Sequence, residues 1–246
     1  MVINIQDKQS QHKAMSAWDD ILVIDDQLSS EEKILKSSVR SYCQEKLLPR
    51  IIDDNRNENF SREIFNEMGE LGILGSYLHG YGCAGTNYVS YGLIAREIEN
   101  IDSAYRSIMS VQTSLVMFPI YQFGTEAQKE EYLPRLAKGE IIGSFGLTEP
   151  DAGSDPGAMK TKAIKVKGGY ELTGTKTWIS NAPYADVIIV WAKDEDNVIR
   201  GFIVDRESKG LSTPKIEGKL SLRASATGQV VCLLYTSPSP RDRISS

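Results

Sequence analysis

The hydrophobic period of the chain changes at about Gly143, and this change limits the possible folds more than any other feature. Before this point, apolar residues recur at helical spacing. After it, they alternate with a period of two, and β-branched and aromatic residues replace Leu, Met and Glu. Runs of helices followed by runs of strands indicate an α+β protein with segregated domains. The sequence therefore predicts an all-helical domain over residues 1–142 and an antiparallel β-sandwich or barrel-like domain over residues 143–231.

Helix-start signals and apolar spacing predict five helices in the first domain. Ser29 precedes Glu32 by three residues, which is the spacing of a capping box. Thr125 precedes Gln128 in the same way. The expected helices run from Ser29 to Pro49, from a cap at Ser61 through Leu71, from about Tyr88 to Glu99, from Asp102 or Ser103 past Phe118 with a kink at Pro119, and from Thr125 to about Lys138.

Alternating apolar residues predict five strands in the second domain. They cover residues 142–147, 163–166, 170–179, 187–192 and 201–204, with tight turns expected at Gly168–Gly169 and Asp194–Asn197. Residues 232–246 then read CLLYTSPSPRDRISS, a Ser/Pro/Arg-rich run without periodicity. Because Pro cannot donate to a sheet ladder, we do not expect this run to continue a central strand, and we interpret it as a flexible or foreign tail.

Composition excludes several classes of protein. With 28 Lys+Arg against 33 Asp+Glu, the net charge is −5, so no basic field would attract nucleic acid. Cys43, Cys83 and Cys232 lack CxxC spacing, and His12 lies far from His79, which argues against a disulfide framework and a metal site. No apolar window approaches the ~18 residues of a membrane span, and the N-terminus lacks a signal core. We expect a soluble protein of a reducing compartment, without a membrane partner.

A glycine motif in the helical domain could be taken for a dinucleotide site. Gly80, Gly82 and Gly85 spell GxGxxG, and Asp102 lies downstream at the distance of a ribose-binding acid. A dinucleotide fingerprint, however, must leave a strand and enter a helix within a βαβ unit, and the preceding segment EIFNEMGELGIL has helical spacing. We therefore interpret the motif as a loop between two helices.

The segment GSFGLTEPDAGSDPG, which begins at Gly143, is the richest in potential binding groups. It leaves a strand and enters a turn of small residues, where backbone amides can approach a ligand closely. Leu147 and Thr148 could face a planar heterocycle, and Gly153 and Ser154 a phosphate or carbonyl. A surface turn with capping residues explains the same composition equally well.

Arg106 stands out because its neighbours are small or apolar, where an unpaired guanidinium would be costly to bury. From spacing alone, the favoured interpretation is an ion pair with Asp102 or with Glu99, which lies seven residues back on the same helix face.

Two motifs resemble one enzyme family. GLTEPDAGSDPGA resembles the strand-and-loop signature of acyl-CoA dehydrogenases, and GTKTWISN, from Gly174, resembles their second flavin-contacting segment. The resemblance covers about residues 18–231. It is closest to glutaryl-CoA dehydrogenases through DDQLSSEEK, YCQEKLLPR, REIFNEMGELGILG, GYGCAG and YRSIMSVQTSLVMFPI.

The resemblance implies a bound FAD and a CoA thioester stacked against the flavin. Thr148 would donate a hydrogen bond to the ring, Ser154 would lie near the CoA, and Trp178 would give aromatic contact. Arg106 would bind the distal carboxylate of a glutaryl chain, oriented by Glu99. The implied cofactor-binding residues are Phe145, Gly146, Leu147, Thr148, Gly153, Ser154, Trp178, Ile179 and Ser180. The implied substrate-binding residues are Arg106, Ser107, Ser110, Ser154 and Glu99.

The implied reaction removes the α-proton of the acyl-CoA while a hydride passes to the flavin, and loss of carbon dioxide then gives crotonyl-CoA. Electrons would leave to an electron-transferring flavoprotein, and the complete family member would be a homotetramer. The family's catalytic base is a Glu in a C-terminal helical domain, which we expect to be missing from a truncated chain that is inactive alone. Alternatives are a dehydrogenase for another short-chain acyl-CoA and a non-catalytic binding or assembly module. We expect a bacterial cytoplasmic protein, or a mitochondrial matrix protein if the source is eukaryotic.

Overall fold

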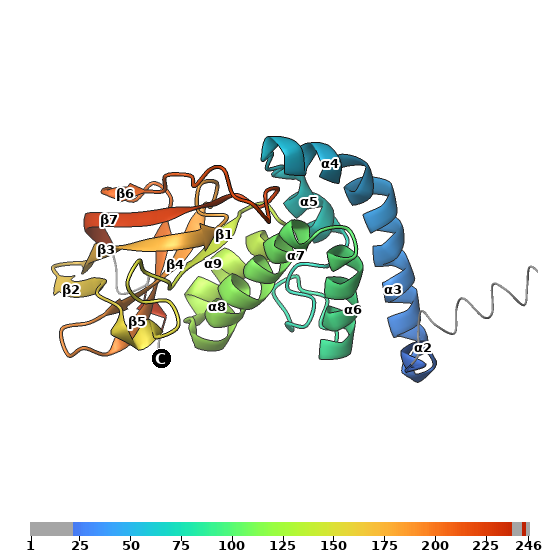
Figure 1. Ribbon diagram of the computed structural model, residues 1–246. Coiled ribbons are helices and arrows are strands. Elements are labelled where there is room, and N and C mark those ends of the chain that lie inside the picture. Colours follow the sequence, from blue (N-terminus) through green and yellow to red (C-terminus); the bar gives the residue numbers. More distant parts are fainter. Residues whose placement is uncertain (1–21, 238–242, 245–246) are drawn as a thin grey trace, which may run out of the picture.

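The computed structural model describes residues 22–237 and 243–244. Figure 1 shows the helices on one side and the sheet on the other, joined where α8 and α9 lie beside the sheet. The helical segments are α2 (Ile24–Gln27), α3 (Ser30–Tyr42), the π-helical η1 (Cys43–Leu47), α4 (Leu48–Asn57), α5 (Glu63–Glu70), α6 (Tyr88–Glu99), α7 (Ser103–Ser110), the π-helical η2 (Val111–Met117), α8 (Phe118–Phe123), α9 (Glu126–Ala137) and the short 3-10 turn η3 (Pro156–Ala158).

Capping explains where most of these helices begin. Ser29 and Thr125 each accept a hydrogen bond from the third residue of the helix that follows, and the side chain of that residue bonds back, so both predicted capping boxes are confirmed. Asp102 caps α7 as predicted. The expected cap at Ser61 is wrong, because α5 begins one residue later than that cap would allow, after Arg62, whose side chain makes no capping bond.

The sequence predicted that the first helix ends at Pro49, and this prediction is wrong. The helix continues through η1 into α4, where Pro49 lies in the first turn. In an α-helix the proline ring would clash with the carbonyl four residues back, but the Leu48 N–H bonds to the Cys43 carbonyl five residues back, so the turn before the proline is wider. Pro119 likewise follows the π-helical η2, and the helix continues past it as α8.

The second half of the chain forms one curled, mixed sheet. Its strands are β1 (Gly143–Gly146), β2 (Lys162–Val166), β3 (Gly169–Ser180), β4 (Val187–Lys193), β5 (Ile199–Asp205), β6 (Leu211–Ser212), β7 (Thr227–Ser237) and β8 (Arg243–Ile244). Their order is β6-β7-β3-β2-β4-β5-β8, and β1 pairs with β4. The α+β fold and the turn at Asp194–Asn197 are confirmed, and the other tight turn lies one residue earlier than predicted, at Lys167–Gly168, because Gly169 already pairs with Val166. The sheet is not purely antiparallel, because β1 runs parallel to β4, which is possible since the hairpin of β2 and β3 lies between them in the chain.

The prediction that residues from Cys232 onward cannot continue a central strand is wrong. Strand β7 runs to Ser237 and lies between β3 and β6. A ladder needs only main-chain donors and acceptors, and the first proline of this run is Pro238, so no donor is lost before that point. Residues 238–242 and 245–246 of the predicted tail, like the N-terminal residues 1–21, lie outside the described residues.

Apolar side chains alternate between the two faces of the sheet. Val187 and Ile189 of β4 belong to a core shared with the helices, whereas Ile188 and Val190 belong to a second core on the other face. The first core fixes the helical domain against the sheet. Over the ranges that the structure describes, no helix is both long and apolar enough to span a membrane.

The GxGxxG motif forms the loop between α5 and α6, as predicted. Gly80, Gly82 and Gly85 all have φ between 67° and 79°, the left-handed region that glycine adopts at no steric cost. The motif follows a helix and not a strand, so it lacks the context of a dinucleotide site.

Candidate functional site

Two bends of the sheet domain are held side by side by one main-chain hydrogen bond and one bond from a side-chain hydroxyl. The first bend follows β1 and contains Leu147 and Thr148. The second lies near the end of β3, at Trp178. The Thr177 N–H donates to the Thr148 carbonyl at 2.9 Å, and the Ser144 hydroxyl donates to the Ser180 carbonyl at 2.9 Å. The two bends, about thirty residues apart in the chain, are therefore brought together at one place.

Trp178 owes its position to an irregularity in β3. The pairing of β3 with β7 shifts register between Lys176 and Ile179, which indicates a β-bulge. Trp178 has φ 59°, a left-handed value that is uncommon for a bulky residue, and its side chain is 62% exposed. Such strain at a large, exposed aromatic residue is typical of functional sites.

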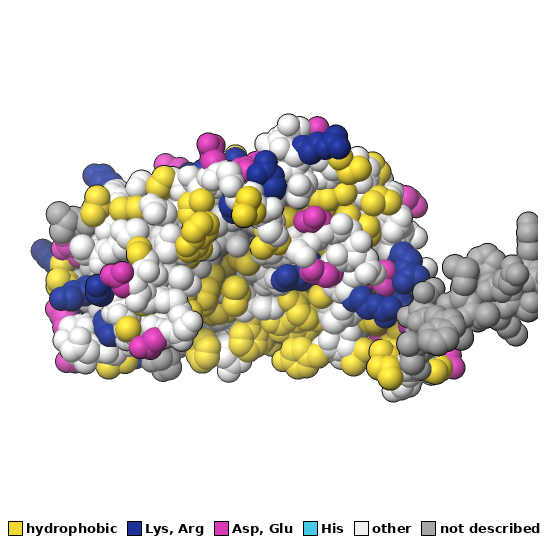
Figure 2. Space-filling model, in the orientation of Figure 1, with side chains coloured by type: hydrophobic (Ala, Val, Ile, Leu, Met, Phe, Trp, Pro, Cys, Tyr) yellow, Lys and Arg dark blue, Asp and Glu magenta, His cyan; other side chains and the backbone are white. Residues whose placement is uncertain are grey.

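A cavity of about 260 Å³ lies between these bends and the helix η2. Its lining residues come from η2, from the end of β1 with the bend after it, and from the bulge of β3: Val111, Leu115, Phe145, Leu147, Thr148, Trp178, Ile179 and Ser180. Figure 2 shows hydrophobic side chains gathered over the face where the sheet meets the helices. Six of the eight lining residues have mainly apolar side chains and two, Thr148 and Ser180, carry hydroxyls, a composition that is common in cofactor and ligand pockets.

The structure brings together six of the nine predicted cofactor-binding residues around this cavity. Gly146 lies behind the wall, where an added Cβ would come within 3.3 Å of Lys176 Cγ. Gly153 and Ser154 are exposed on the turn and do not line the cavity. The sequence predicted only that Val111 and Leu115 lie in a helix and did not place them at the site. In the structure both line the cavity, and Leu115 is 39% exposed, which is unusual for a core leucine.

The lining residues fit a flat, conjugated ring with polar edges. Apolar side chains of η2 and β1 supply contact surface, and Trp178 adds an aromatic face. Among the residues that the structure describes, the side-chain polar atoms of Thr148, Trp178 and Ser180 make no hydrogen bond, so they are available to a ligand. The volume, about 260 Å³, lies just below the range of ligand pockets, which is about 300–1,000 Å³, and suits a ring system and not a whole dinucleotide.

A buried ion pair lies directly behind the first bend. Lys176 Nζ is 2.8 Å from Glu149 Oε1, and both side chains are almost fully buried. Burial opposes ionisation of Glu149, but hydrogen bonds from Lys176, from Thr161 and from the Lys160 amide outweigh it and lower the Glu149 pKa to about 2. Burial lowers the pKa of Lys176, and Glu149 partly offsets this effect.

Arg106 pairs with one of the two predicted partners. Its Nε donates to Glu99 Oε2 at 2.6 Å and its Nη1 donates to the Ser110 hydroxyl at 3.2 Å. Asp102 is instead engaged as the cap of α7. A hydrogen bond from Ser103 and, next, the pair with Arg106 lower the pKa of Glu99. The structure therefore gathers Arg106, Glu99 and Ser110 on a partly exposed helix face.

Ser107 contributes only its main chain to this cluster, because its carbonyl accepts a hydrogen bond from the Ser110 hydroxyl. Ser110 directly precedes Val111, the first residue of η2 and part of the cavity wall. At 1.5 Å per residue, Arg106 lies about 7.5 Å along the helix axis from Val111. Arg106 and the cavity wall formed by η2 therefore belong to one continuous helix.

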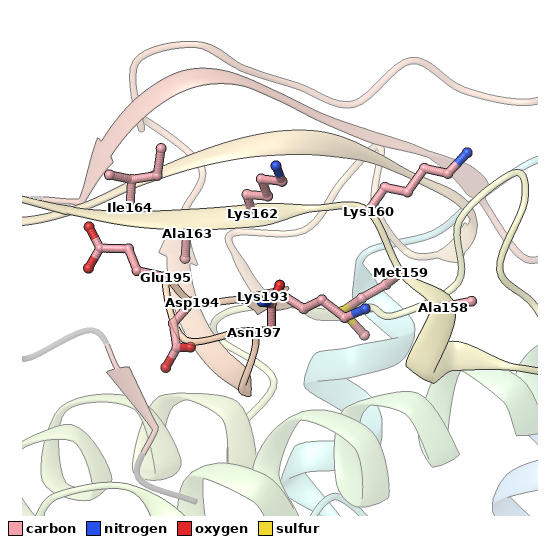
Figure 3. Close-up of a pocket in the computed structure, with 10 residues that line it drawn as sticks. All are labelled: Ala158, Met159, Lys160, Lys162, Ala163, Ile164, Lys193, Asp194, Glu195 and Asn197. Atoms are coloured by element: carbon pink, nitrogen blue, oxygen red, sulfur yellow. The ribbon is translucent and has the colours of Figure 1, made fainter.

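A larger cavity, about 640 Å³, lies at the other end of the sheet domain. Figure 3 shows its residues on β2, the segment before it, and the turn between β4 and β5: Ala158, Met159, Lys160, Lys162, Ala163, Ile164, Lys193, Asp194, Glu195 and Asn197. Lys160 pairs with Asp151, whereas Lys162 and Lys193 form no ion pair within the described part of the chain. None of its residues was predicted as a site residue.

Comparison with known domain families assigns both halves of the chain. Residues 29–140 match the N-terminal domain of acyl-CoA dehydrogenases, and residues 144–232 match the middle domain. The chain belongs to the acyl-CoA dehydrogenase family. The predicted family is thereby confirmed, and the matched ranges follow the change from helices to strands in this acyl-CoA dehydrogenase family member.

Three relatives of this acyl-CoA dehydrogenase family member show how far the similarity extends. A glutaryl-CoA dehydrogenase of Mycobacterium smegmatis, solved in complex with FADH2, is 44% identical with a TM-score of 0.89, over 92% of this chain and 58% of that one. A glutaryl-CoA dehydrogenase in complex with glutaryl-CoA is 32% identical with a TM-score of 0.85, over 89% and 57%. The mitochondrial isovaleryl-CoA dehydrogenase of Pongo abelii is 37% identical over 223 residues, which are 86% of this chain and 53% of the relative.

This acyl-CoA dehydrogenase family member spans little more than half the length of those relatives. The relatives also differ in the acyl group that they are named for, glutaryl in two and isovaleryl in the third. Family membership therefore does not fix the substrate.

Proposed function

We propose that this chain forms the flavin-facing part of an FAD-dependent acyl-CoA dehydrogenase, with glutaryl-CoA as the favoured substrate. The cavity between the two bends is the observation that carries the proposal, because its apolar walls and unpaired polar side chains suit a flavin ring. A similar glutaryl-CoA dehydrogenase was solved with FADH2, which supports the choice of cofactor.

Each wall of the cavity has a defined task in this proposal. When bound, FAD accepts the hydride that leaves the β-carbon of the acyl chain. The Thr148 hydroxyl would donate a hydrogen bond to the ring, and Trp178 would pack against it with Phe145, Leu147, Ile179 and Ser180. Gly146 would leave room for Lys176 behind the cavity wall, because a side chain at this position would press on Lys176.

Gly153 and Ser154 are proposed to contact the CoA. They lie on the exposed turn after the first bend, outside the cavity wall. That position suits contact with a ligand that passes over the flavin and leaves toward solvent.

The proposed role of Arg106 is to bind the distal carboxylate of glutaryl-CoA. Glu99 takes its Nε and Ser110 its Nη1, while Nη2 has no partner among the described residues. Glu99 and Ser110 thus orient the guanidinium and leave one end of it available, and charged hydrogen bonds to a carboxylate are stronger than neutral ones. Ser107 would contribute through its carbonyl, which orients the Ser110 hydroxyl.

The proposed reaction needs a base that takes the α-proton. None of the residues that line the cavity carries a carboxylate. We therefore take the base from a part of the protein beyond these 246 residues, and we expect the chain alone to bind ligands without turnover. Loss of carbon dioxide to give crotonyl-CoA, electron transfer to an electron-transferring flavoprotein, a homotetramer, and a bacterial cytoplasmic or mitochondrial matrix location complete the proposal.

Flavin titration tests the cofactor proposal. FAD added to the chain should quench the emission of Trp178, and the Trp178→Phe variant should lose that component while Trp191 still emits. A variant with Tyr184→Phe, also at an exposed aromatic residue but outside the cavity, is the matched control. FAD binding that Trp178→Phe leaves unchanged in affinity and in quenching would place the flavin elsewhere, and a chain that takes up no FAD would favour the non-catalytic binding or assembly module.

A second candidate is a dehydrogenase of another short-chain acyl-CoA. The isovaleryl-CoA dehydrogenase relative and the complete ion pair between Arg106 and Glu99 favour it. Comparing acyl-CoA affinities separates the two. Arg106→Gln should weaken glutaryl-CoA binding by about 1.5 kcal/mol, the lower end for charged hydrogen bonds because the site is partly exposed, and leave butyryl-CoA binding unchanged. Equal losses for both ligands would favour the second candidate.

A further inference from the structure

Both members of the buried pair Lys176–Glu149 make further hydrogen bonds. Besides Lys176, Glu149 accepts bonds from the Lys160 N–H at 2.6 Å, from the Thr161 N–H at 3.0 Å and from the Thr161 hydroxyl. Lys176 also donates to the Leu147 carbonyl at 3.2 Å. The exposed fractions of the two side chains are only 1% and 5%, so the pair is shielded from solvent.

Stability alone does not account for such a pair. Withdrawing two charges from water is costly, and apolar residues of similar volume are often neutral or stabilising in their place. A buried pair is therefore better explained by what it fixes in space than by the energy that it contributes.

What the pair fixes is the distance between the two bends. Lys176 bonds to the Leu147 carbonyl, and the next residue, Thr177, bonds through its N–H to the Thr148 carbonyl. Two consecutive residues of β3 thus hold two consecutive residues of the first bend. The residue after them is Trp178, in the bulge that forms the opposite wall of the cavity.

We propose that Lys176 and Glu149 are positioning residues for the flavin: neither lines the cavity, and together they set the separation of the Thr148 and Trp178 walls. This inference rests on the proposed function for its ligand. Glu149 bonds to Thr161, the residue directly before β2, and Lys176 bonds to the Leu147 carbonyl of the first bend. Because a flat ring must contact both walls at once, a change in their separation lowers its affinity.

The test replaces both charges, so that neither is left buried without a partner. The variant Glu149→Gln/Lys176→Met is compared with Asp151→Asn/Lys160→Met, a matched control that removes an ion pair of the same length, 2.8 Å, from the same turn. The control pair is largely exposed, at 72% and 75% of its side chains. FAD dissociation constants come from fluorescence titration, and melting temperatures show that each variant is folded.

We expect FAD to bind about tenfold more weakly to the double variant, equivalent to about 1.4 kcal/mol, and with unchanged affinity to the control. The exchange of the Thr177 amide with solvent should accelerate in the double variant only, since that amide bonds across the two bends. Unchanged FAD affinity in a folded double variant, or a lower melting temperature with the FAD affinity of the folded protein intact, would overturn the inference.

A single variant covers the case in which the double variant does not fold. Glu149→Gln keeps an acceptor oxygen for only one of the two backbone amides, because they bond to different oxygens of the carboxylate. Burial already lowers the Lys176 pKa, so the amine can lose its proton and remain buried. The same loss of FAD affinity and faster Thr177 exchange are expected. If the unaltered chain takes up no FAD, the proposed function fails. Amide exchange then decides the positioning role alone, and a Thr177 exchange rate unaffected by the substitutions refutes it.

Discussion

Adding one methyl group at Gly143 should separate the helix η2 from the sheet. A Cβ built at Gly143 would lie 2.5 Å and 2.8 Å from the two Cγ atoms of Val116, which is fully buried. Carbon atoms in favourable contact are about 3.5–4.0 Å apart, so one side must retreat by about 1 Å. Gly143 is not in the left-handed region, so the effect of Gly143→Ala is steric and not conformational.

The strand has little freedom to move away from the helix. The Gly143 N–H donates to Gln112 Oε1 at 2.7 Å, and its carbonyl accepts from Asn181 Nδ2 at 3.2 Å. Overpacking a core costs about 1–3 kcal/mol, and replacing glycine by alanine restores about 0.4–1 kcal/mol through the unfolded state. We expect Gly143→Ala to lower the unfolding free energy by about 1–2 kcal/mol, measured by urea denaturation.

A double-mutant cycle decides whether the Val116 contact is the cause. Val116→Ala removes the two Cγ atoms that the new methyl group would meet most closely and leaves the Val116 Cβ, 2.9 Å away. Alone it should cost about 2 kcal/mol through lost burial and the cavity left behind. In that background Gly143→Ala should cost at least about 1 kcal/mol less than in the unaltered chain. An equal cost in both backgrounds would refute the packing argument.

Two further predictions concern stability. Ser29→Ala removes the cap of α3 and should cost about 1 kcal/mol in denaturant unfolding, whereas Ser61→Ala, which removes no cap, should stay within about 0.5 kcal/mol; equal costs would contradict the capping assignment. Glu149 has a pKa lowered to about 2, so its contribution, about 3 kcal/mol, is present above the ordinary carboxyl pKa and disappears as the pH falls from about 5 to 2. The difference in unfolding free energy between the unaltered chain and Glu149→Gln should therefore shrink over that interval, and a constant difference would disprove the linkage.

Local signals along the chain predict the structure correctly where neighbours in sequence determine it. The caps at Ser29, Asp102 and Thr125 act within three residues, so their geometry is implied by spacing. Ser61 shows the limit, since a residue able to cap does not do so when the chain enters the helix one residue later. The strand through Cys232 shows another limit, because its partner β3 lies about sixty residues away in the chain.

The partner of Arg106 depends on both local spacing and the helix cap next to it. Spacing allowed Asp102 or Glu99 as partner, and the structure selects Glu99 because Asp102 is occupied as a helix cap. The helix that carries Arg106 continues past Phe118, as the spacing predicts, but only the structure shows that its π-helical part η2 forms a wall of the cavity.

The sequence alone determined the two-domain order, the main helix starts, the five strands β1 to β5, and the motifs of the acyl-CoA dehydrogenase family. Only the tertiary structure decided that the bends at Thr148 and Trp178 share one cavity, that η2 forms its third wall, and that Lys176 and Glu149 pair behind it. Periodicity and capping arise from residues a few positions apart, whereas a cavity and a buried ion pair depend on which distant segments pack together, and that packing is set by the whole core at once.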